Sequence, residues 1–386
     1  MRLSQLMLRN VRRSPLRTGM TVMTVAIMLA AFIFPRTLVD AQDEQIRQTP
    51  NDRVVTRPKL GWGGTLPLSY IQSIGELPGI NLVVGGRFAG LRVPAKERVF
   101  FQAQATDIGA FLAMHTELVV PPEQRDAFSK DERSVMIGTQ LAELLDLKLG
   151  DRVTLEGTFL PGKWEVTVAA ICRSTREGFG DRWLWLHYDH YNRGLPVADQ
   201  DRINIIAARI DQPNQGGRIA TEIDAKFTDS QFETLSLEDK VLTASLVGRF
   251  RAILDALDAV SYLILVVVMS MLSNTLAINV RERTREYGVM RAIGFGRGQL
   301  VWLVLGEAAV LGLVGSLIGL GISYPLFEGL VSRVLRDALQ FPPIEVPLRV
   351  ALTAVALGAG VSMVSAWVPA YRVSQLGITE SLRRVA

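Results

Sequence analysis

The side chains in this sequence that are best suited to hold a metal ion lie near its middle. They are His187, Asp189 and His190, in an aromatic segment that reads Trp-Leu-Trp-Leu-His-Tyr-Asp-His-Tyr. A closed metal site needs a further ligand that the sequence does not offer, and the single cysteine excludes a cysteine cage. An aromatic strand end explains the same residues. We therefore expect packing inside the protein or contact with a partner protein, with metal binding as the alternative.

Motifs for nucleotide binding and hydrolysis are absent from the sequence. No Gly-x4-Gly-Lys-[Ser/Thr] loop occurs, because the run 294–298, Gly-Phe-Gly-Arg-Gly, lacks the lysine and follows no expected strand. Neither HExxH nor GxSxG is present. We expect no catalytic, cofactor-binding or metal-binding residue in this chain, and we do not expect it to be an enzyme.

Two polar residues stand inside apolar stretches. Glu307 lies a turn or two into the stretch 300–324, and an ionisable residue at such a position is a functional candidate. The alternative is that Glu307 lies near the membrane surface and pairs with a flanking arginine. Asn274 is less costly to bury, and we expect it to make a hydrogen bond between helices.

Four apolar stretches are long enough to cross a membrane. The clearest, 259–280, has 22 residues without a charge. At ~1.5 Å per residue this gives about 33 Å of helix, which is enough for the hydrocarbon core. The others are 18–39, 300–324 and 350–368. A hydrophobic fraction of 48% and a mean hydropathy of +0.23 fit this concentration of apolar residues. No small-residue cleavage site follows the first stretch, which favours a retained anchor over a signal peptide.

Residues 40–258 are polar and mixed, and they form the expected extramembrane domain. Strands are expected at 51–57, 80–84, 203–210 and 232–237, and helices at 67–77 and 217–227. Between them, a strand that enters a short helix is followed by alternating strands near 152–156 and 164–170. The fold class is therefore an α-helical membrane protein with four transmembrane helices and a large α+β domain outside the membrane, with a β-rich insertion at about 100–195.

An amphipathic stalk helix is expected at about 237–258, directly before the span 259–280. It would add roughly 30 Å of helix outside the membrane. Its apolar residues recur at helical spacing and are Leu242, Leu246, Phe250, Leu254 and Leu257. A stalk, a span and the charged segment after it, in one continuous rod, suggest a part that carries motion across a membrane.

Arginine residues are concentrated on one side of the expected spans. The segments 1–17, 281–299 and 369–386 carry five, five and three arginines, whereas the loop 325–349 offsets its three arginines with three acids. Basic segments that flank a span remain on the cytoplasmic side of the membrane. We therefore expect an inner-membrane protein in which these three segments and both termini are cytoplasmic. Residues 40–258 would then be periplasmic or extracellular. Because segment 1–17 leads directly into an apolar span, we expect no nucleic-acid partner.

Small residues recur on one face of each of the last two spans. They include Gly315 and Gly319 in one span, and Gly358 and Ser362 in the other. Such faces let helices approach closely in lipid. They predict packing within the chain or a seam between two copies, and packing within the chain is the favoured reading.

The segment 281–299 combines arginines with a short apolar face. A basic membrane flank explains the arginines, but not the acids Glu282 and Glu286 or the run Tyr-Gly-Val-Met-Arg-Ala-Ile-Gly that ends at Gly294. This pattern predicts a short amphipathic helix with a glycine stop, suited to dock in a groove of another protein.

The run 282–294, ERTREYGVMRAIG, resembles the signature after the second span of FtsX/MacB-type permeases, the type VII or mechanotransmission ABC transporters. LRNVRRSPLRT at 8–18 resembles their amphipathic lead-in to the first span, and GEA at 306–308 resembles part of their third. The tail PAYRVSQLGITESLR at 369–383 resembles the segment after their fourth span. Over 40–236 only the layout is similar: a split, porter-like α+β part with a β-rich insertion, as in the macrolide-exporter and lipoprotein-releasing (MacB/LolC-like) members.

The resemblance implies a homo- or heterodimeric permease paired with two copies of a separate cytoplasmic ATPase. ATP and magnesium would bind that partner, so no cofactor is implied in this chain; a periplasmic adaptor or substrate-binding protein is a further candidate partner. The implied ATPase-coupling residues are Arg281, Glu282, Arg283, Arg285, Glu286, Tyr287, Met290, Arg291 and Ile293. The implied second ATPase contact consists of Gln375, Leu376, Ile378, Glu380 and Leu382.

The function implied is that of a permease subunit which transmits ATP-driven motion to its periplasmic domain. Its task would be export or envelope transport of a hydrophobic or amphipathic substrate. One alternative is a subunit of a complex that extracts lipoproteins or lipids. The other is an FtsX-like regulator of cell-wall hydrolases that transports nothing, although the domain 40–236 is larger than expected for such a regulator.

Overall fold

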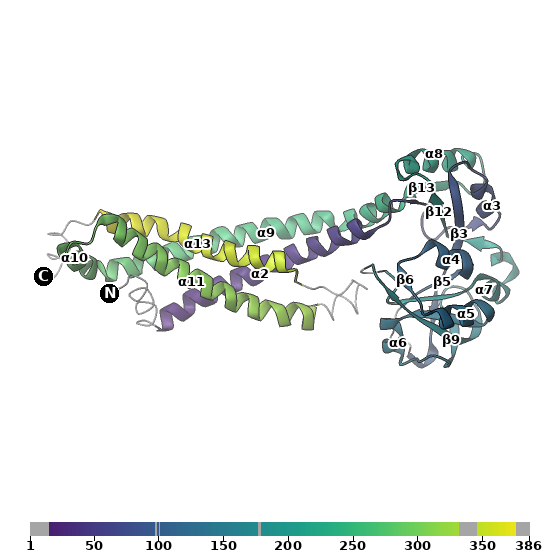
Figure 1. Ribbon diagram of the computed structural model, residues 1–386, viewed down its shortest axis with the longest axis horizontal. Coiled ribbons are helices and arrows are strands. Elements are labelled where there is room, and N and C mark those ends of the chain that lie inside the picture. The colour runs from purple at the N-terminus through teal and green to yellow at the C-terminus, as the bar shows by residue number, and fades with distance from the viewer. Residues whose placement is uncertain (1–14, 97–98, 100, 177–178, 332–345, 376–386) are drawn as a thin grey trace. The chain divides into compact units, whose positions relative to one another are not determined.

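The computed structural model describes residues 15–96, 99, 101–176, 179–331 and 346–375 (Figure 1). The chain divides into two compact units. Residues 1–42 with 250–386 form one, which we call the membrane unit, and residues 43–249 form the other, which we call the head. Each unit is described by itself below.

The membrane unit contains four long helices and one short helix among the described residues. Their bounds are α2 (Pro15–Gln48), α9 (Asp239–Glu282), α10 (Thr284–Ala292), α11 (Arg297–Pro325) and α13 (Leu348–Ser374), with a π-helical segment η4 (Leu326–Val331) after α11. All four long helices are long and apolar enough to cross a membrane. Each of them extends beyond the span expected from the sequence, since the uncharged stretch sets only the part that lipid requires.

Helix α2 continues through Pro35 and lies against α9 at this level. Proline has no N–H, so the carbonyl of Ala31 loses its donor within the helix. The hydroxyl of Ser261 in α9 lies 3.4 Å from this carbonyl, but its proton goes to the carbonyl of Leu257, one turn earlier in α9, at 2.8 Å. The next residue of α2, Arg36, pairs with Asp258 of α9 at 3.4 Å. These contacts hold α2 against α9 within the membrane unit.

Helix α11 packs against α2 through two glycines. A Cβ at Gly315 would lie 2.7 Å from the Cβ of Val25, and one at Gly319 would lie 2.8 Å from the carbonyl oxygen of Ala26. Only a residue without a side chain allows the two helices to approach this closely.

Helix α11 also packs against α13 through small residues. A Cβ at Gly358 would collide with the hydroxyl of Ser316, and one at Gly312 would lie 2.6 Å from the hydroxyl of Ser362. Both serines are buried. The small-residue faces of the third and fourth spans therefore lie in contacts within the chain.

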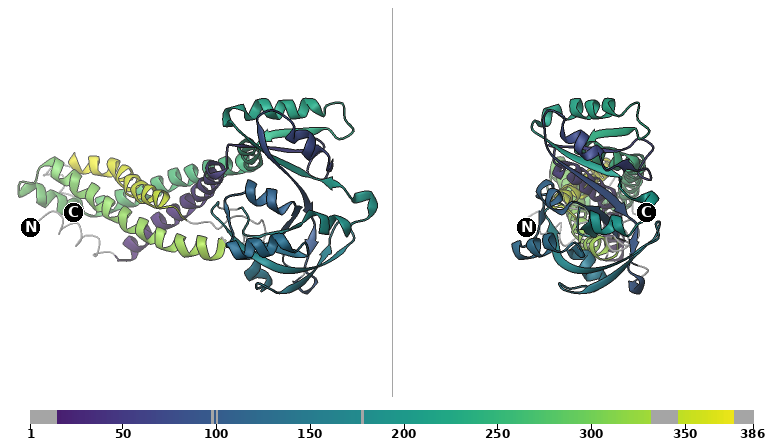
Figure 2. Two further views of the ribbon diagram at one scale, coloured as in Figure 1. Left: turned by 45° about the vertical axis from the view of Figure 1, so that its right-hand side comes forward. Right: turned by 90° about the vertical axis from the view of Figure 1, so that its right-hand side faces the viewer.

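The head is an α/β unit with short helices (Figure 2). Its helices are α3 (Tyr70–Gly75), α4 (Ile108–Met114), α5 (Pro122–Lys130), α6 (Thr139–Leu145), α7 (Tyr188–Arg193) and α8 (Gly216–Lys226). Its strands are β1 (Arg53–Pro58), β2 (Leu66–Pro67), β3 (Ile80–Ala89), β4 (Leu91–Arg92), β5 (Gln102–Thr106), β6 (Leu118–Val119), β7 (Ser134–Gly138), β8 (Arg152–Gly157), β9 (Lys163–Ser174), β10 (Trp183–His187), β11 (Arg202–Ile203), β12 (Ile205–Ile210) and β13 (Thr234–Glu238).

In the described part of the head, one 11-stranded mixed sheet runs beside a two-stranded sheet of β2 and β11. Its hydrogen-bonded order is β13-β1-β12-β3-β5-β10-β7-β9-β8-β4, with β6 paired to β9. The strands of the β-rich insertion expected at about 100–195 belong to this sheet. They join it where β3 pairs with β5, as at Phe88 and Gln104. The sequence pattern shows the strands, but it does not show that their hydrogen bonds continue into the rest of the domain.

The sheet has an apolar core on each face. In β10, Leu184 and Leu186 lie in one core and Trp185 lies in the other, because successive side chains of a strand point to opposite faces. Helices α3, α6, α7 and α8 contribute to the first core, and α4 and α5 contribute to the second.

Candidate functional site

The short helix α10 follows α9 at the end of the second span and is held by its neighbours in the membrane unit. Tyr287 is buried in an apolar cluster with Leu276 of α9 and Leu300 of α11. Burial raises the pKa of Tyr287 to about 12, so its hydroxyl stays neutral. Arg291 donates a hydrogen bond to the carbonyl of Ser374, the last residue of α13, at 3.4 Å.

An ion pair joins the start of this segment to α11. Arg283 Nη1 lies 3.2 Å from Glu307 Oε2, and both side chains are largely buried. Glu307 therefore pairs with a flanking arginine, which is the alternative that we considered for it. Removing one partner of a buried pair leaves the other charge uncompensated. We accordingly assign Glu307 to anchoring α10.

One side of α10 is exposed. Arg285, Val289 and Ile293 recur four residues apart, and all three are exposed. The other expected coupling residues are exposed (Arg281 and Glu282), half-buried (Arg283, Glu286, Met290 and Arg291) or buried (Tyr287). Tyr287 is thus a packing residue rather than part of the exposed side. Val289 was missed, although its spacing from Arg285 and Ile293 could have revealed it.

The expected second ATPase contact is only partly described. Gln375 is exposed, and its amide donates to the hydroxyl of Tyr371 at 2.8 Å. The remaining residues lie outside the described part of the chain: Leu376, Ile378, Glu380 and Leu382.

The expected stalk lies in α9, which continues as one helix from Asp239 to Glu282. Leu242 is buried, Leu246 is exposed and Leu257 is half-buried against Leu38. The side chains of Phe250 and Leu254 lie outside the described part of the structure.

The aromatic segment singled out in the sequence packs inside the head. Trp183 and Trp185 stack with ring centroids 5.9 Å apart, and Trp185 lies 5.5 Å from the ring of Phe111. The Nε2 of His187 lies 2.7 Å from the carbonyl oxygen of Phe128. Among the residues that the structure describes, no group of three His, Cys, Asp or Glu is placed to hold a metal. The aromatic side chains of this segment therefore pack in the core of the head.

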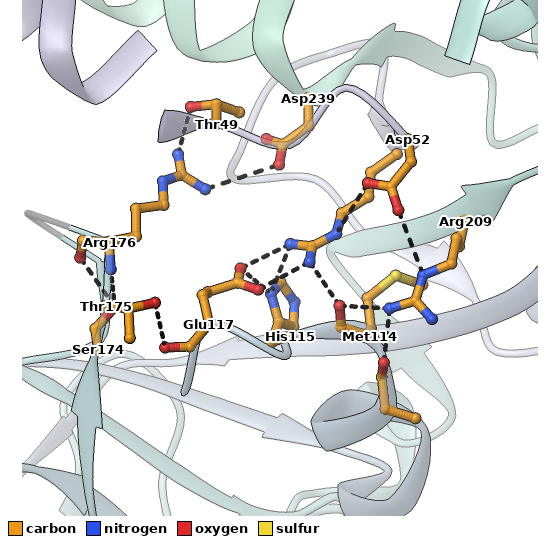
Figure 3. A network of polar contacts seen from close by, with 12 residues as sticks. Thr49, Asp52, Met114, His115, Glu117, Ser174, Thr175, Arg176, Arg209 and Asp239 are labelled. Carbon is orange, nitrogen blue, oxygen red and sulfur yellow. Dashed lines mark hydrogen bonds and ion pairs between the residues drawn. The ribbon is translucent and has the colours of Figure 1, made fainter. Parts of the chain in front are cut away.

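A buried polar network lies in the head beside the start of β1 (Figure 3). Arg53 donates to both carboxylate oxygens of Glu117, at 2.7 and 2.8 Å, and to the carbonyl of Met114 at 2.6 Å. The Nδ1 of His115 lies 3.1 Å from Arg53 and 3.0 Å from Glu117. Arg209 of β12 donates to the same Met114 carbonyl at 2.8 Å. The network thus joins β1 and β12 to the turn between α4 and β6.

Arg176 extends this network to the two long helices (Figure 3). It donates to the hydroxyl of Thr49, the residue after α2, at 2.8 Å, and it lies 3.9 Å from the carboxylate of Asp239, the first residue of α9. These residues come from distant segments, so no motif spacing in the sequence indicated them. The head-side ends of both long helices are therefore tied to the loop after β9.

The network shifts the proton affinities of its members. Burial would raise the pKa of Glu117, but the hydrogen bonds and charges of Arg53 and His115 outweigh burial and hold that pKa far below its usual range. Burial lowers the pKa of His115, and Glu117 opposes this only in part. Burial raises the pKa of Asp239 against the charge of Arg176.

Acidification should therefore destabilise the head. Below the ordinary His pKa of 6.5, the unfolded chain binds a proton at residue 115 that the folded head resists, so the free energy of unfolding falls as the pH drops. Below pH 4.5, the ordinary pKa of a glutamate, Glu117 adds to this fall because its pKa is lowered in the folded head. Asp239 opposes the fall, because its pKa is raised in the folded head. Comparing the unsubstituted protein with His115→Gln isolates the contribution of His115 to this pH dependence.

The measurement is the thermal unfolding midpoint of the full chain in detergent between pH 7 and 5. It is followed by tryptophan fluorescence, because four of the six tryptophans lie in the head. The midpoint of the unsubstituted protein should fall further than that of His115→Gln. Parallel pH profiles would show that His115 contributes nothing.

The fold and site define a class: a membrane protein in which one helix runs from a β-sheet head into a membrane span and is followed by a short, partly exposed helix. Residues 259–378 match the family model described as FtsX-like permease C-terminal. The chain thus carries a region of the FtsX-like permease C-terminal family, which supports the resemblance of its sequence to ABC transporter permeases of the FtsX/MacB type.

Several named proteins are similar to the chain over part of their length. The macrolide export ATP-binding/permease protein MacB of Neisseria gonorrhoeae is 24% identical over 260 residues, which cover 66% of this chain and 39% of that protein. The uncharacterized ABC transporter permease YknZ of Bacillus subtilis is 23% identical over 203 residues, which cover 52% of this chain and 49% of that protein. The chain thus spans less than half the length of these relatives.

Two solved structures are similar to part of the chain. The periplasmic region of MacB from Actinobacillus actinomycetemcomitans matches with a TM-score of 0.38 and 11% identity, covering 52% of this chain and 95% of that one. The extracellular domain of YknZ matches with a TM-score of 0.36 and 10% identity, covering 48% of this chain and 99% of that one.

Proposed function

We propose that this permease transmits ATP-driven motion from a separate cytoplasmic ATPase to its head, for export or envelope transport of a hydrophobic or amphipathic substrate. The observation that carries the proposal is α9, a single helix of 44 residues. At ~1.5 Å per residue it is about 66 Å long, roughly twice the hydrocarbon thickness of a bilayer. This helix begins directly after strand β13 of the head, and it ends at Glu282, two residues before α10 begins.

The ATPase would dock on the exposed side of α10. Arg285 supplies charge there, and Val289 and Ile293 supply apolar surface. A short helix with apolar anchors four residues apart suits a groove in a partner. Arg283–Glu307 and Tyr287 would hold α10 rigidly, so that displacement of the ATPase moves α9.

The remaining assignments follow from the family. Two ATPase copies would bind ATP and magnesium, and a second permease copy, with a periplasmic adaptor or substrate-binding protein, would complete the complex. The tail from Gln375 would give a second ATPase contact. The termini would be cytoplasmic and the head periplasmic, in the inner membrane. The name of the gonococcal relative, a macrolide export protein, supports export.

The double substitution Arg285→Glu, Val289→Asp tests the docking side. Because both side chains are exposed, the membrane unit should fold normally, while charge reversal and a buried carboxylate should weaken docking by at least ~1.4 kcal/mol, about tenfold. The measurement is ATP hydrolysis by the copurified ATPase with the permease in nanodiscs. Stimulation by the permease should fall about tenfold.

A matched control exists in the head. Arg152 and Leu149 are also an exposed arginine and an exposed apolar residue. The pair Arg152→Glu, Leu149→Asp should leave stimulation unchanged. Full stimulation by the α10 variant would reject this docking side.

A further inference from the structure

Two adjoining cavities lie along α9 in the membrane unit. The first, of about 360 Å³, is lined by polar groups that include Asn274, Arg281, Thr284 and Arg372, and we call it the charged pocket. The second, of about 290 Å³, lies between α2 and α9, and we call it the apolar groove. Ile278 lines both, so the two cavities adjoin at this side chain.

The charged pocket holds two arginines that lack an acidic partner. Arg281 of α9 and Arg372 of α13 are exposed, and within the described residues neither makes a side-chain hydrogen bond or ion pair. The neighbouring Arg283, in contrast, pairs with Glu307. The pocket therefore has an excess positive charge of two from groups that are still able to bind an anion.

Neutral polar groups complete the pocket. Asn274 lies seven residues before Arg281, two turns along the same side of α9, about 10 Å away. Its side chain makes no hydrogen bond within the part of the chain that the structure describes, so the expected interhelical bond is not found. The hydroxyl of Thr284 donates to the carbonyl of Arg281 at 2.9 Å and keeps its own lone pairs. An amide near hydrocarbon gains stability from a polar ligand.

The groove is apolar despite its threonines. Thr24 donates its hydroxyl to the carbonyl of Met20 at 2.8 Å, and Thr275 donates to that of Met271 at 2.9 Å. Their polar atoms are thus satisfied within their own helices. The rest of the lining comes from methionine, leucine and isoleucine side chains and from Thr21, which also has a polar partner. This chemistry suits a hydrocarbon chain.

We propose that the charged pocket and the apolar groove together bind one anionic phospholipid. Its phosphate pairs with Arg281 and Arg372, and an acyl chain lies along the groove past Ile278. Charge complementarity selects an anion, and the apolar continuation selects a lipid over free phosphate or an acidic segment of a partner protein. Arg281 ends the uncharged stretch 259–280, which is the level of the lipid head groups, where basic pockets between helices bind anionic lipids. The site goes beyond the proposed function and does not depend on it.

Native mass spectrometry of the purified full chain tests the site, with phosphatidylglycerol and phosphatidylcholine of equal chain length as probes. The unsubstituted protein should retain phosphatidylglycerol preferentially. Each arginine near a head group contributes an attraction worth several-fold in affinity, so Arg281→Gln, Arg372→Gln should bind it about 10- to 30-fold more weakly. The control Arg285→Gln, Arg297→Gln removes the same charge from exposed residues outside the pocket and should bind normally.

Two further arms separate the sources of the anion. Ile278→Trp, which fills the junction with the groove, should weaken lipid binding, and millimolar inorganic phosphate should not displace the lipid. Displacement by phosphate, equal losses in the two arginine variants, or normal lipid binding in Arg281→Gln, Arg372→Gln with weaker ATPase binding would each overturn the proposal. All variants change exposed side chains, and unchanged unfolding midpoints would show that they fold.

Discussion

Leucine at Gly315 is expected to lower the thermal unfolding midpoint of the purified chain. The leucine Cβ would lie 2.7 Å from Val25 Cβ and 3.0 Å from the carbonyl oxygen of Val22, both in α2. Overpacking of this kind costs about 1–3 kcal/mol. In a unit of this size that corresponds to roughly 5 °C. Thermal unfolding in detergent, followed by fluorescence, measures the change.

Gly321 in the same helix supplies the control. A Cβ there meets nothing within 4 Å, so Gly321→Leu removes a helix glycine without steric cost. Its midpoint should stay the same or rise. If Gly315→Leu instead keeps its midpoint but separates two copies of the chain on gel filtration, the small-residue face is a seam between protomers.

Alanine at Glu117 should destabilise the head more strongly. The substitution leaves the guanidinium of Arg53, 4% exposed, without the carboxylate that accepts two of its hydrogen bonds. Breaking a buried ion pair from one side costs about 3–5 kcal/mol. The unfolding midpoint of the head, followed by tryptophan fluorescence, should fall well below that of the unsubstituted chain.

Two variants show whether the uncompensated charge is the cause. Glu132 pairs with Arg193 on the exposed surface, so Glu132→Ala should leave the midpoint unchanged. Arg53→Met, Glu117→Leu removes both charges and should recover part of the loss. If the double variant were as unstable as Glu117→Ala, lost packing rather than the uncompensated charge would be the cause.

The membrane part of the fold could be predicted because its signals are local. An uncharged stretch such as 259–280 needs no partner to be recognised as a span. The inner and outer sides of α10 could not be told apart, since both carry apolar residues. Tyr287 and Met290 pack inward, whereas Val289 and Ile293 are exposed.

The head shows where local patterns are insufficient. Its strands were visible as alternating residues, but β1 pairs with β12 through Val54 and Ala208, positions 154 residues apart. The buried network has the same origin, because Arg53, Glu117 and Arg176 meet only after the sheet has formed. Residue types at such separations carry no spacing that distinguishes them from surface charges.

The contacts beside Pro35 restrict how α2 and α9 can move. Arg36 donates to the hydroxyl of Tyr262 at 2.6 Å, and it pairs with Asp258, one turn earlier in α9, at 3.4 Å. Sliding by one turn, ~5.4 Å, would break both contacts together and leave the guanidinium of Arg36 without these partners. Tilting about this level keeps both. Helices α2 and α9 can therefore tilt against each other at this level, but they cannot slide along each other.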